Sequence, residues 1–491
     1  MTTSTVPDPV PAPRPASMDG LFGQLWPEPE PAARPRVVGA AVAVGLLAAV
    51  VLPFRDLGVG TFVTLVAVGA TVVVTGRAPR SPYLWAVAGL CLSLSAVVML
   101  RDAEWLSVLA VLAAFGLGCS ALVDARTVAG LVASGSAVPL AALRGLPWLG
   151  RSVRAVGRVG SMWPALRTAA ISLVLVAVFG ALFVSADALF ASWVDALLPD
   201  LSLGTSVLRL TVLVLVGGVT LAASYVALNP PHVDRLAPPE GTRVARAFEW
   251  LVPVCLLLAL YVGFVAAQLT VMFGGHGYLR RTTGLTYAEH VHQGFGQLTV
   301  ATVLTLGVVA VTARKAPRSS VRERVLLRGV LGGLCGLTLV VVASALFRMH
   351  VYEEAYGFTR LRVLVSVFEA WVGLVLLLVL VAGVRLRGRW VPRAAALSGA
   401  VTLLALAVVN PDGYVAERNV ARYLETGKAD WYYLAGLSAD AVPALRQLPS
   451  RAEACVFGPP RESDDDWLEW NLGRARAGSA TLDAGLGCLA R

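Results

Sequence analysis

Long apolar stretches separated by short polar segments fill the chain between Val37 and Val409. A helix needs about 20 mostly apolar residues to cross the hydrocarbon core of a bilayer. Open strands and irregular loops cannot face lipid, because their N–H and C=O groups would lack hydrogen bonds. The pattern therefore predicts an all-α integral membrane protein with about eleven transmembrane helices. The predicted spans are residues 37–53, 58–75, 83–100, 105–123, 168–186, 208–228, 251–273, 295–313, 325–347, 363–384 and 394–409.

The arginines and lysines between these stretches alternate loop by loop. The loops on one side, beginning with residues 1–36, carry 24 of them, and the loops on the other side carry 8. Cytoplasmic loops have the Lys/Arg excess. We therefore predict a cytoplasmic N-terminus and, after an odd number of spans, an extracytoplasmic C-terminus.

Residues 127–143 are the weak point of this topology. They are apolar enough for a twelfth span, but inserting them would place 13 downstream basic residues outside and 6 inside, against the rule. We therefore expect a peripheral or re-entrant segment. The stretch that follows, residues 149–163, has apolar and arginine faces at helical spacing, as in a helix lying in the membrane interface. A solvated basic loop is the alternative.

The two ends of the chain differ from its middle. Residues 1–36 hold nine prolines and are expected to form a disordered cytoplasmic tail, not a signal peptide. Residues 37–410 form the predicted transmembrane domain. Residues 411–491 are the largest polar piece and are expected to form a small helical extracytoplasmic domain, with helices at 414–425, 430–437, 439–447 and 465–477. Cys455 and Cys488 lie in this tail, where an oxidising compartment favours a disulfide over two free thiols.

Composition supports the membrane assignment and narrows the partners. The chain is 57% hydrophobic and only 15% charged, whereas soluble domains are about 25% charged. Its net charge of +10 comes from arginines spread over membrane loops, so the lipid bilayer and its anionic headgroups are the expected partners and nucleic acid is not. Only two of the 41 basic residues are lysines, a bias that suggests a GC-rich bacterial genome and hence a bacterial plasma membrane.

The predicted outer loop between the ninth and tenth spans, residues 348–362, concentrates polar side chains. It leads into Glu369, about 10 Å deep in the tenth span at 1.5 Å per residue, on the same helical face as Arg362. An ionisable residue within a span indicates a functional site by default. Three interpretations remain open: an Arg362–Glu369 pair that only fixes helix packing, a proton or ion path, and a site for a polar ligand.

A second predicted outer loop, residues 274–294, holds three of the five histidines. His290 and His292 with Glu289 are possible Zn or Cu ligands. No cysteine or HExxH-type spacing supports a metal, so interfacial polar residues are the favoured interpretation, and we expect no metal and no cofactor. We interpret Asp187, at the outer end of the fifth span, as part of a helical extension in the membrane interface that is anchored there by aromatic residues.

Several segments, in this order, resemble a bacterial family of polytopic membrane proteins, domain of unknown function 4153/4173. They are Phe183–Phe190; Leu285–Glu289 with Gly294-Phe295; Tyr352–Arg362; Asn410–Asp412 with Asn419, Arg422, Tyr433-Leu434 and Asp440–Pro443; and Trp467–Leu472. The family has no established activity, so the resemblance implies fold and topology and not a mechanism. In the predicted topology these motifs fall at the outer ends of spans five, eight, ten and eleven, and we expect those ends to converge on one extracytoplasmic site.

The favoured hypothesis is a non-enzymatic protein that binds an envelope component, a small ligand or a membrane protein partner at its outer face. A secondary transporter using Glu369 and Arg362 is one alternative, and a membrane enzyme acting on a lipid-linked substrate is another. The candidate binding residues are Asp187, Tyr287, Glu289, Arg348, Tyr352, Glu353, Tyr356, Arg360, Arg362, Glu369, Asn410, Asp412, Asn419 and Arg422.

Overall fold

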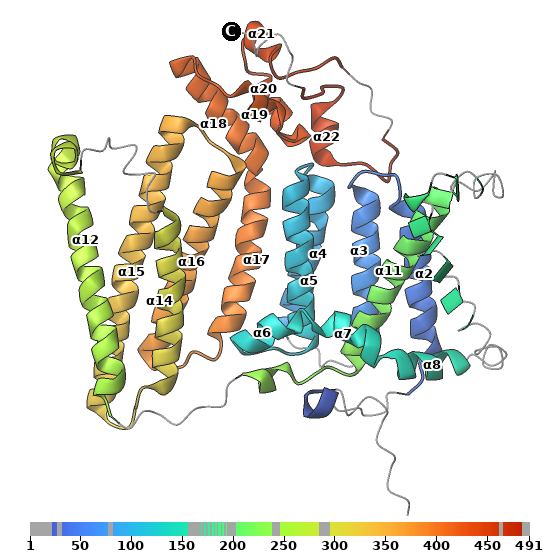
Figure 1. Cartoon of the computed structure of the whole chain (residues 1–491), viewed down its shortest axis with the longest axis horizontal. Helices are drawn as coiled ribbons and strands as arrows, with labels where there is room; N and C mark the ends of the chain where they lie inside the picture. Colours follow the sequence, from blue (N-terminus) through green and yellow to red (C-terminus); the bar gives the residue numbers. More distant parts are fainter. Residues whose placement is uncertain are drawn as a thin grey trace, which may run out of the picture.

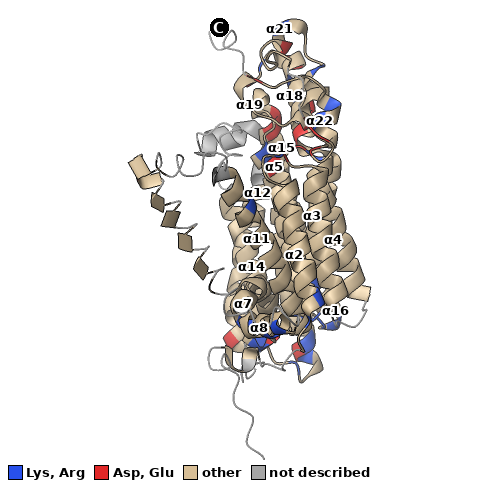
Figure 2. Ribbon diagram, turned by 90° about the vertical axis from the view of Figure 1, so that its right-hand side faces the viewer, with Lys and Arg blue, Asp and Glu red and all other residues tan. Residues whose placement is uncertain are grey.

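The structure, a computed structural model, describes residues 22–26, 32–76, 82–155, 203–237, 246–283, 295–460 and 465–483, with scattered positions between 168 and 193. Tall helices stand side by side, and shorter helices cover the two ends of the bundle (Figure 1). Charged side chains gather at these two ends, while the long sides of the bundle are mostly apolar (Figure 2). This distribution fits a bilayer around the middle of the molecule.

One half of the bundle consists of α2 (Pro35–Val51), α3 (Val59–Thr75), α4 (Pro82–Leu100), α5 (Glu104–Leu122), α11 (Leu203–Leu228) and α17 (Val391–Val409). Helices α2 and α11 pack closely, because Gly45 and Gly217 face each other. A Cβ atom on Gly45 would lie 2.7 Å from the carbonyl oxygen of Leu213. Small residues permit such close approach between helices in a membrane, where van der Waals packing drives association.

The other half contains α12 (Phe248–Thr283), α14 (Phe295–Lys315), α15 (Val321–Tyr356) and α16 (Arg360–Arg385). Leu334, Ala345 and Leu376 are fully buried in its core. Helix α16 connects the two halves, because it packs against α15 on one side and α17 on the other.

Eight of the described helices are long and apolar enough to cross a membrane, and α2 and α3 are shorter apolar helices. All ten coincide with predicted spans. The span predicted at 168–186 lies almost wholly outside the described residues, so the count of eleven stays a prediction. Helix α8 (Leu146–Arg154) lies at one end of the bundle, whereas α11 begins at the other (Figure 1).

Residues 127–143 form two short helices, α6 (Val128–Ser134) and α7 (Ala137–Arg144). At 1.5 Å per residue neither is long enough to cross a bilayer. Together with α8 they lie across one end of the bundle, and we call these three helices the platform (Figure 1). Residues 127–143 therefore form no single helix long enough to span a bilayer, and their peripheral or re-entrant position in the membrane stays a prediction. Helix α8 covers only part of the predicted interfacial stretch 149–163, whose remainder lies outside the described residues.

A piece of the proline-rich N-terminal segment is anchored to the platform end. Trp26, in the segment Phe22–Trp26, is only 2% exposed and donates a hydrogen bond from Nε1 to the Asn229 carbonyl at 2.7 Å. Arg144 donates to the Trp26 carbonyl at 3.1 Å and lies over the Phe22 ring. Residues 22–26 were predicted to be part of a disordered tail, but the structure gives them defined contacts with the bundle. Residues 1–21 lie outside the described residues.

The C-terminal residues 411–460 and 465–483 cover the opposite end, and we call them the cap. The cap contains α18 (Pro411–Thr426), α19 (Trp431–Ala435), η3 (Ala439–Ala441), α20 (Val442–Leu445), α21 (Ser450–Glu453) and α22 (Leu472–Ala477). Its Val415 and Leu445 share one hydrophobic cluster with Leu94 and Leu106 of the membrane helices. The cap is thus packed onto the bundle. Residues 465–471 are turns and extended chain, not the helix start that was predicted.

The predicted outer loop 348–362 is mostly helical. Helix α15 continues to Tyr356, and only residues 357–359 separate it from α16. Thr359 begins α16 by accepting a hydrogen bond from the Arg362 backbone, and Gly357 has a φ of +90°. The hydropathy pattern missed this extension because the last turns of α15 are polar. Similarly, α12 extends to Thr283, into the predicted loop 274–294.

The orientation of the two ends can be tested with single cysteines. Tyr432 of the cap is 74% exposed, and Arg322 is exposed at the opposite end of the bundle. We expect a membrane-impermeant maleimide to label Tyr432→Cys in intact cells and Arg322→Cys only after lysis, because the loops at the Arg322 end carry the arginine excess. The unsubstituted chain measures the background. The reverse pattern would invert the predicted topology.

Candidate functional site

The strongest polar contact between the cap and the membrane helices is an ion pair between Asp412 and Arg360. Arg360 donates from Nε and a terminal nitrogen to the two Asp412 oxygens, at 2.8 and 2.5 Å. The Ser438 N–H donates to the same carboxylate at 2.9 Å, and Trp105 Nε1 donates at 3.3 Å. The Asp412 side chain is fully buried and that of Arg360 is 32% exposed. Asp412 therefore ties α18 to α5, to α16 and to the turn before η3.

Asn419 holds the turn between α15 and α16. Its Nδ2 donates to the Phe358 carbonyl at 2.8 Å, and its Oδ1 accepts from the Phe358 N–H at 3.1 Å. The neighbouring Gly357 packs against the same amide, since a Cβ there would lie 2.7 Å from Asn419 Oδ1. Arg422 adds a hydrogen bond to the Ala355 carbonyl at 2.9 Å. Both side chains thus bind backbone and fix the cap to the top of α15.

Tyr433 completes this joint from α19. Its hydroxyl oxygen accepts a hydrogen bond from the Arg360 backbone N–H at 2.6 Å. The N–H groups of the first turn of a helix lack partners within the helix. Tyr433 therefore satisfies one of them at the start of α16.

A second joint links the cap to the start of α5. The buried Asp440 carboxylate accepts from the Asp102 N–H at 2.7 Å and from the Ala103 N–H at 3.1 Å. In return, Asp102 accepts from the Ala439 N–H at 2.9 Å. Asn410, in the left-handed region with φ of +61°, caps α18 and donates to the Asp440 carbonyl. The reciprocal bonds position the η3 turn over α5.

The two buried cap carboxylates have opposite pKa shifts. Burial alone raises the pKa of Asp412, but hydrogen bonds from Arg360 and Ser438 and the guanidinium charge outweigh it, so this pKa lies below its usual value. Burial dominates at Asp440 and raises its pKa above the usual value, although hydrogen bonds from Asp102 and Ala103 oppose the shift. Asp412 therefore stabilises the cap as an anion above about pH 4, and this contribution is lost as the pH falls through its lowered pKa.

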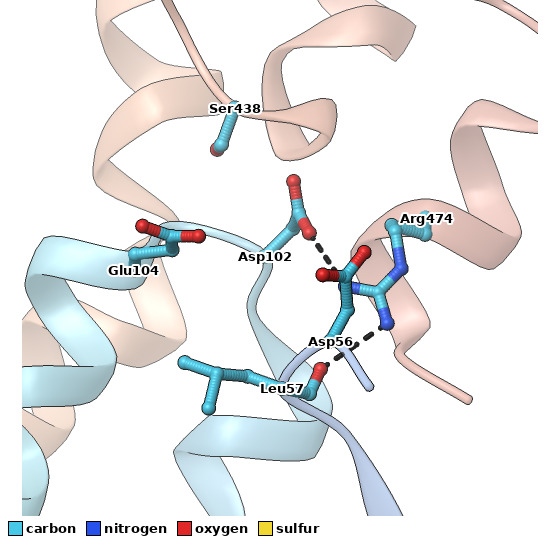
Figure 3. A pocket seen from close by; sticks show the side chains of 6 residues that line it. All are labelled: Asp56, Leu57, Asp102, Glu104, Ser438 and Arg474. Atoms are coloured by element: carbon cyan, nitrogen blue, oxygen red, sulfur yellow. Dashed lines mark hydrogen bonds and ion pairs between the residues drawn. The ribbon is translucent and has the colours of Figure 1, made fainter. Parts of the chain in front are cut away.

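A polar recess of about 370 Å³ opens between these joints. It is lined by Asp56, Leu57, Asp102, Glu104, Ser438 and Arg474, which come from the α2–α3 turn, the start of α5 and the cap (Figure 3). Arg474 pairs with Asp102 at 3.0 Å and with Asp465 at 2.9 Å. No ion pair between described residues involves the exposed Asp56 or Glu104 carboxylate. The wall of the recess therefore carries excess negative charge.

Several predicted site residues thus meet at the cap, namely Arg360, Asn410, Asp412, Asn419 and Arg422. Their polar groups are largely taken up by contacts within the protein. The recess residues Asp56, Asp102, Glu104 and Arg474 were not predicted. In the sequence, Asp56, Asp102 and Glu104 are marked only by their position in the very short segments after the first and third predicted spans. Arg474 is marked only by its position in the C-terminal tail.

Arg362 and Glu369, for which an ion pair was one of three open interpretations, contact different groups in the structure. Arg362 donates to the Gly357 carbonyl oxygen, and its guanidinium carbon lies 4.4 Å from the centre of the Tyr352 ring. Glu369 instead accepts a hydrogen bond from Thr299 Oγ1 of α14 at 2.9 Å. Arg362 therefore contacts the end of α15, whereas Glu369 contacts α14.

Other predicted residues lie apart from the cap joints. The rings of Tyr352 and Tyr356 on α15 are tilted against each other with their centres 4.8 Å apart, and Glu353 is buried on the same helix. Asp187 is exposed and accepts hydrogen bonds from the N–H groups of Leu189 and Phe190.

Arg348, the remaining predicted residue of α15, is half-buried. Tyr287, Glu289 and Cys488 lie outside the described residues. Cys455 is buried in the cap and disulfide-bonded. Its pairing with Cys488 stays a prediction. Among the described residues no group of three or more His, Cys, Asp or Glu side chains could hold a metal ion.

Comparison with known families now identifies the class of protein. Residues 86–448 match the model of the domain of unknown function DUF4153. The match covers most of the chain, which therefore belongs to this family of helical membrane proteins. No curated protein and no solved structure matches the chain.

Replacing Asp412 tests whether the first joint holds the cap. We expect Asp412→Asn to lower the free energy of unfolding by about 2 kcal/mol or more, because breaking a buried ion pair costs about 3–5 kcal/mol and the partial exposure of Arg360 reduces that cost. Thermal unfolding and tryptic cleavage of the cap, both in detergent micelles, measure the effect. The control is Glu417→Gln, which neutralises an exposed residue of the same helix. Equal stability and equal cleavage of the two variants would contradict the role of the pair.

Proposed function

We propose that the chain is a non-enzymatic multi-pass membrane protein that binds a cationic group of a small ligand or envelope component in the recess under the cap. The observation that carries this proposal is the charge of the recess wall, where three carboxylates face a single arginine. Arg474 is already shared by Asp102 and Asp465. Ammonium groups are the complementary chemistry, because they donate several hydrogen bonds to carboxylates.

The size and position of the recess suit a small group. Its volume of about 370 Å³ lies within the range of small-molecule sites, about 300–1,000 Å³. Its walls come from three separate segments that the cap joints hold together, so the geometry is set before a ligand arrives. Such preorganisation reduces the entropy lost on binding. The arginine distribution favours an extracytoplasmic position for this end of the bundle.

The two alternative functions have less support. A transporter using both Glu369 and Arg362 would require the two groups to act together, but Arg362 is bound to Gly357 and Tyr352. For a membrane enzyme, Glu353 is a poor candidate because it is buried beside the α15–α16 turn, away from the recess. These contacts favour the binding hypothesis.

A polyamine probe tests the proposal. We expect spermidine to raise the thermal unfolding midpoint of the purified full chain in a concentration-dependent manner, since a ligand that binds only the folded state stabilises it. Glu104→Gln is expected to weaken binding about fivefold, because one exposed charge pair contributes up to about 1 kcal/mol. Isothermal titration calorimetry at low and high salt measures both effects, and salt should weaken the interaction.

Glu417→Gln serves again as the matched control, because it removes the same charge from the cap surface outside the recess. Sucrose and glutamate serve as neutral and anionic probes. Stabilisation by either of these without stabilisation by spermidine would overturn the assignment of a cationic ligand. Equal spermidine affinity in Glu104→Gln and Glu417→Gln would place the binding site elsewhere.

A further inference from the structure

Glu369 is a carboxyl group enclosed among the membrane helices. It lies nine residues into α16, about 13 Å below the start of the helix, and it is 0% exposed. Its Oε2 atom accepts the hydrogen bond from Thr299, whereas its buried Oε1 atom has no hydrogen-bond partner among the described residues. In the described part of the chain, the carboxyl group thus accepts one hydrogen bond and keeps one buried oxygen without any.

The elements packed against α16 offer few charges at this depth. Helix α14 carries its two charged residues, Arg314 and Lys315, in its last turn. The one charged residue of α17, Arg393, binds Asp124 at the platform end. In α18, Asp412 is occupied by Arg360.

Helix α15 contributes charges nearer to Glu369. His350 pairs with Glu354 on the exposed side of this helix, at 3.3 Å. Arg348 is eight residues before the end of α15 and therefore lies at a depth similar to that of Glu369, but the described contact of the Glu369 carboxyl group is with Thr299 and not with Arg348. Among the described residues, Arg348 is the cation placed to neutralise Glu369 if the carboxyl group were ionised.

An ionised carboxylate in this setting is unfavourable. Removing a charge from water costs several kcal/mol unless a counter-charge and hydrogen bonds replace the lost hydration. Glu369 accepts one hydrogen bond from a neutral hydroxyl group and forms no ion pair with any described residue. A protonated carboxyl group has no such charge to compensate and needs only modest polar contacts.

We propose that Glu369, with Thr299, forms a buried proton-binding site in the α12–α16 half of the bundle. At neutral pH Glu369 holds the proton as a carboxylic acid, and Thr299 donates to the carboxyl oxygen that does not carry it. Loss of the proton would place a charge between α14 and α16 and change how these helices pack. The site is remote from the recess under the cap and does not depend on its ligand.

Infrared spectroscopy of the full chain in lipid nanodiscs tests this directly. A protonated carboxyl group has a C=O stretch well above the amide bands, whereas a carboxylate does not. We expect such a band at pH 7, its loss in Glu369→Gln, and a shift to lower frequency in D2O, which shows that the proton exchanges. Thr299→Val keeps the carboxyl group and should move the band to higher frequency, because the hydrogen bond to the C=O group is lost.

The Thr299→Val shift keeps the proposal testable even if Glu369→Gln fails to fold. Glu353→Gln removes another buried carboxyl group of this half and should leave the Glu369 band in place. A wild-type spectrum without the band at pH 7 would overturn the proposal. If the band then appeared only in Arg348→Gln, Glu369 would instead be an anion paired with Arg348. Loss of the band on adding sodium would assign a cation site in place of the proton site.

Discussion

The capping of helix ends by side chains of the cap and of the neighbouring α2–α3 and α4–α5 turns is the constraint on which the rest of the structure depends. The last carbonyl groups of a helix have no partner within the helix, and at the edge of a bilayer they need one. Arg101 donates to the Ala407 and Val408 carbonyls at the end of α17, and Asn471 donates to the Val98 carbonyl near the end of α4. Arg55 donates to the Val50 carbonyl of α2 and also pairs with Asp466. The contacts between the cap and the helix ends therefore stabilise both parts. The recess keeps its shape because these contacts hold the cap in one position on the bundle.

The sequence predicted the helices well because lipid imposes a simple rule on them. Ten predicted spans coincide with helices, since a long apolar run in a membrane has no other way to pair its backbone. The same rule says little about polar segments, which is why residues 348–356 were read as a loop although they continue α15. It also cannot pair distant residues: Arg360 and Asp412 are 52 positions apart, and Arg474 and Asp102 are 372 apart. The recess depends on such pairings, so its residues could not be found from spacing.

Several polar residues of this chain that were predicted to bind a ligand have a structural role instead. Residues such as Arg360, Asp412 and Asn419 look like ligand contacts in the sequence, because buried polar groups are otherwise rare in membrane proteins. In the structure they bind backbone or one another, and they fix where the cap sits. The carboxylates left facing solvent are Asp56, in the α2–α3 turn, and Glu104, the first residue of α5, and no sequence motif marks either of them.

Hydrogen–deuterium exchange of the full chain in nanodiscs tests most directly whether the cap and bundle form one unit. The Asp102 and Ala103 amides donate to Asp440, and the Ala439 amide donates to Asp102. If the cap is fixed on the helix ends, peptides containing these amides should exchange as slowly as the body of α5, because they open only when the unit unfolds. Fast exchange throughout residues 411–460, with α5 still protected, would show a loosely attached cap and contradict the account.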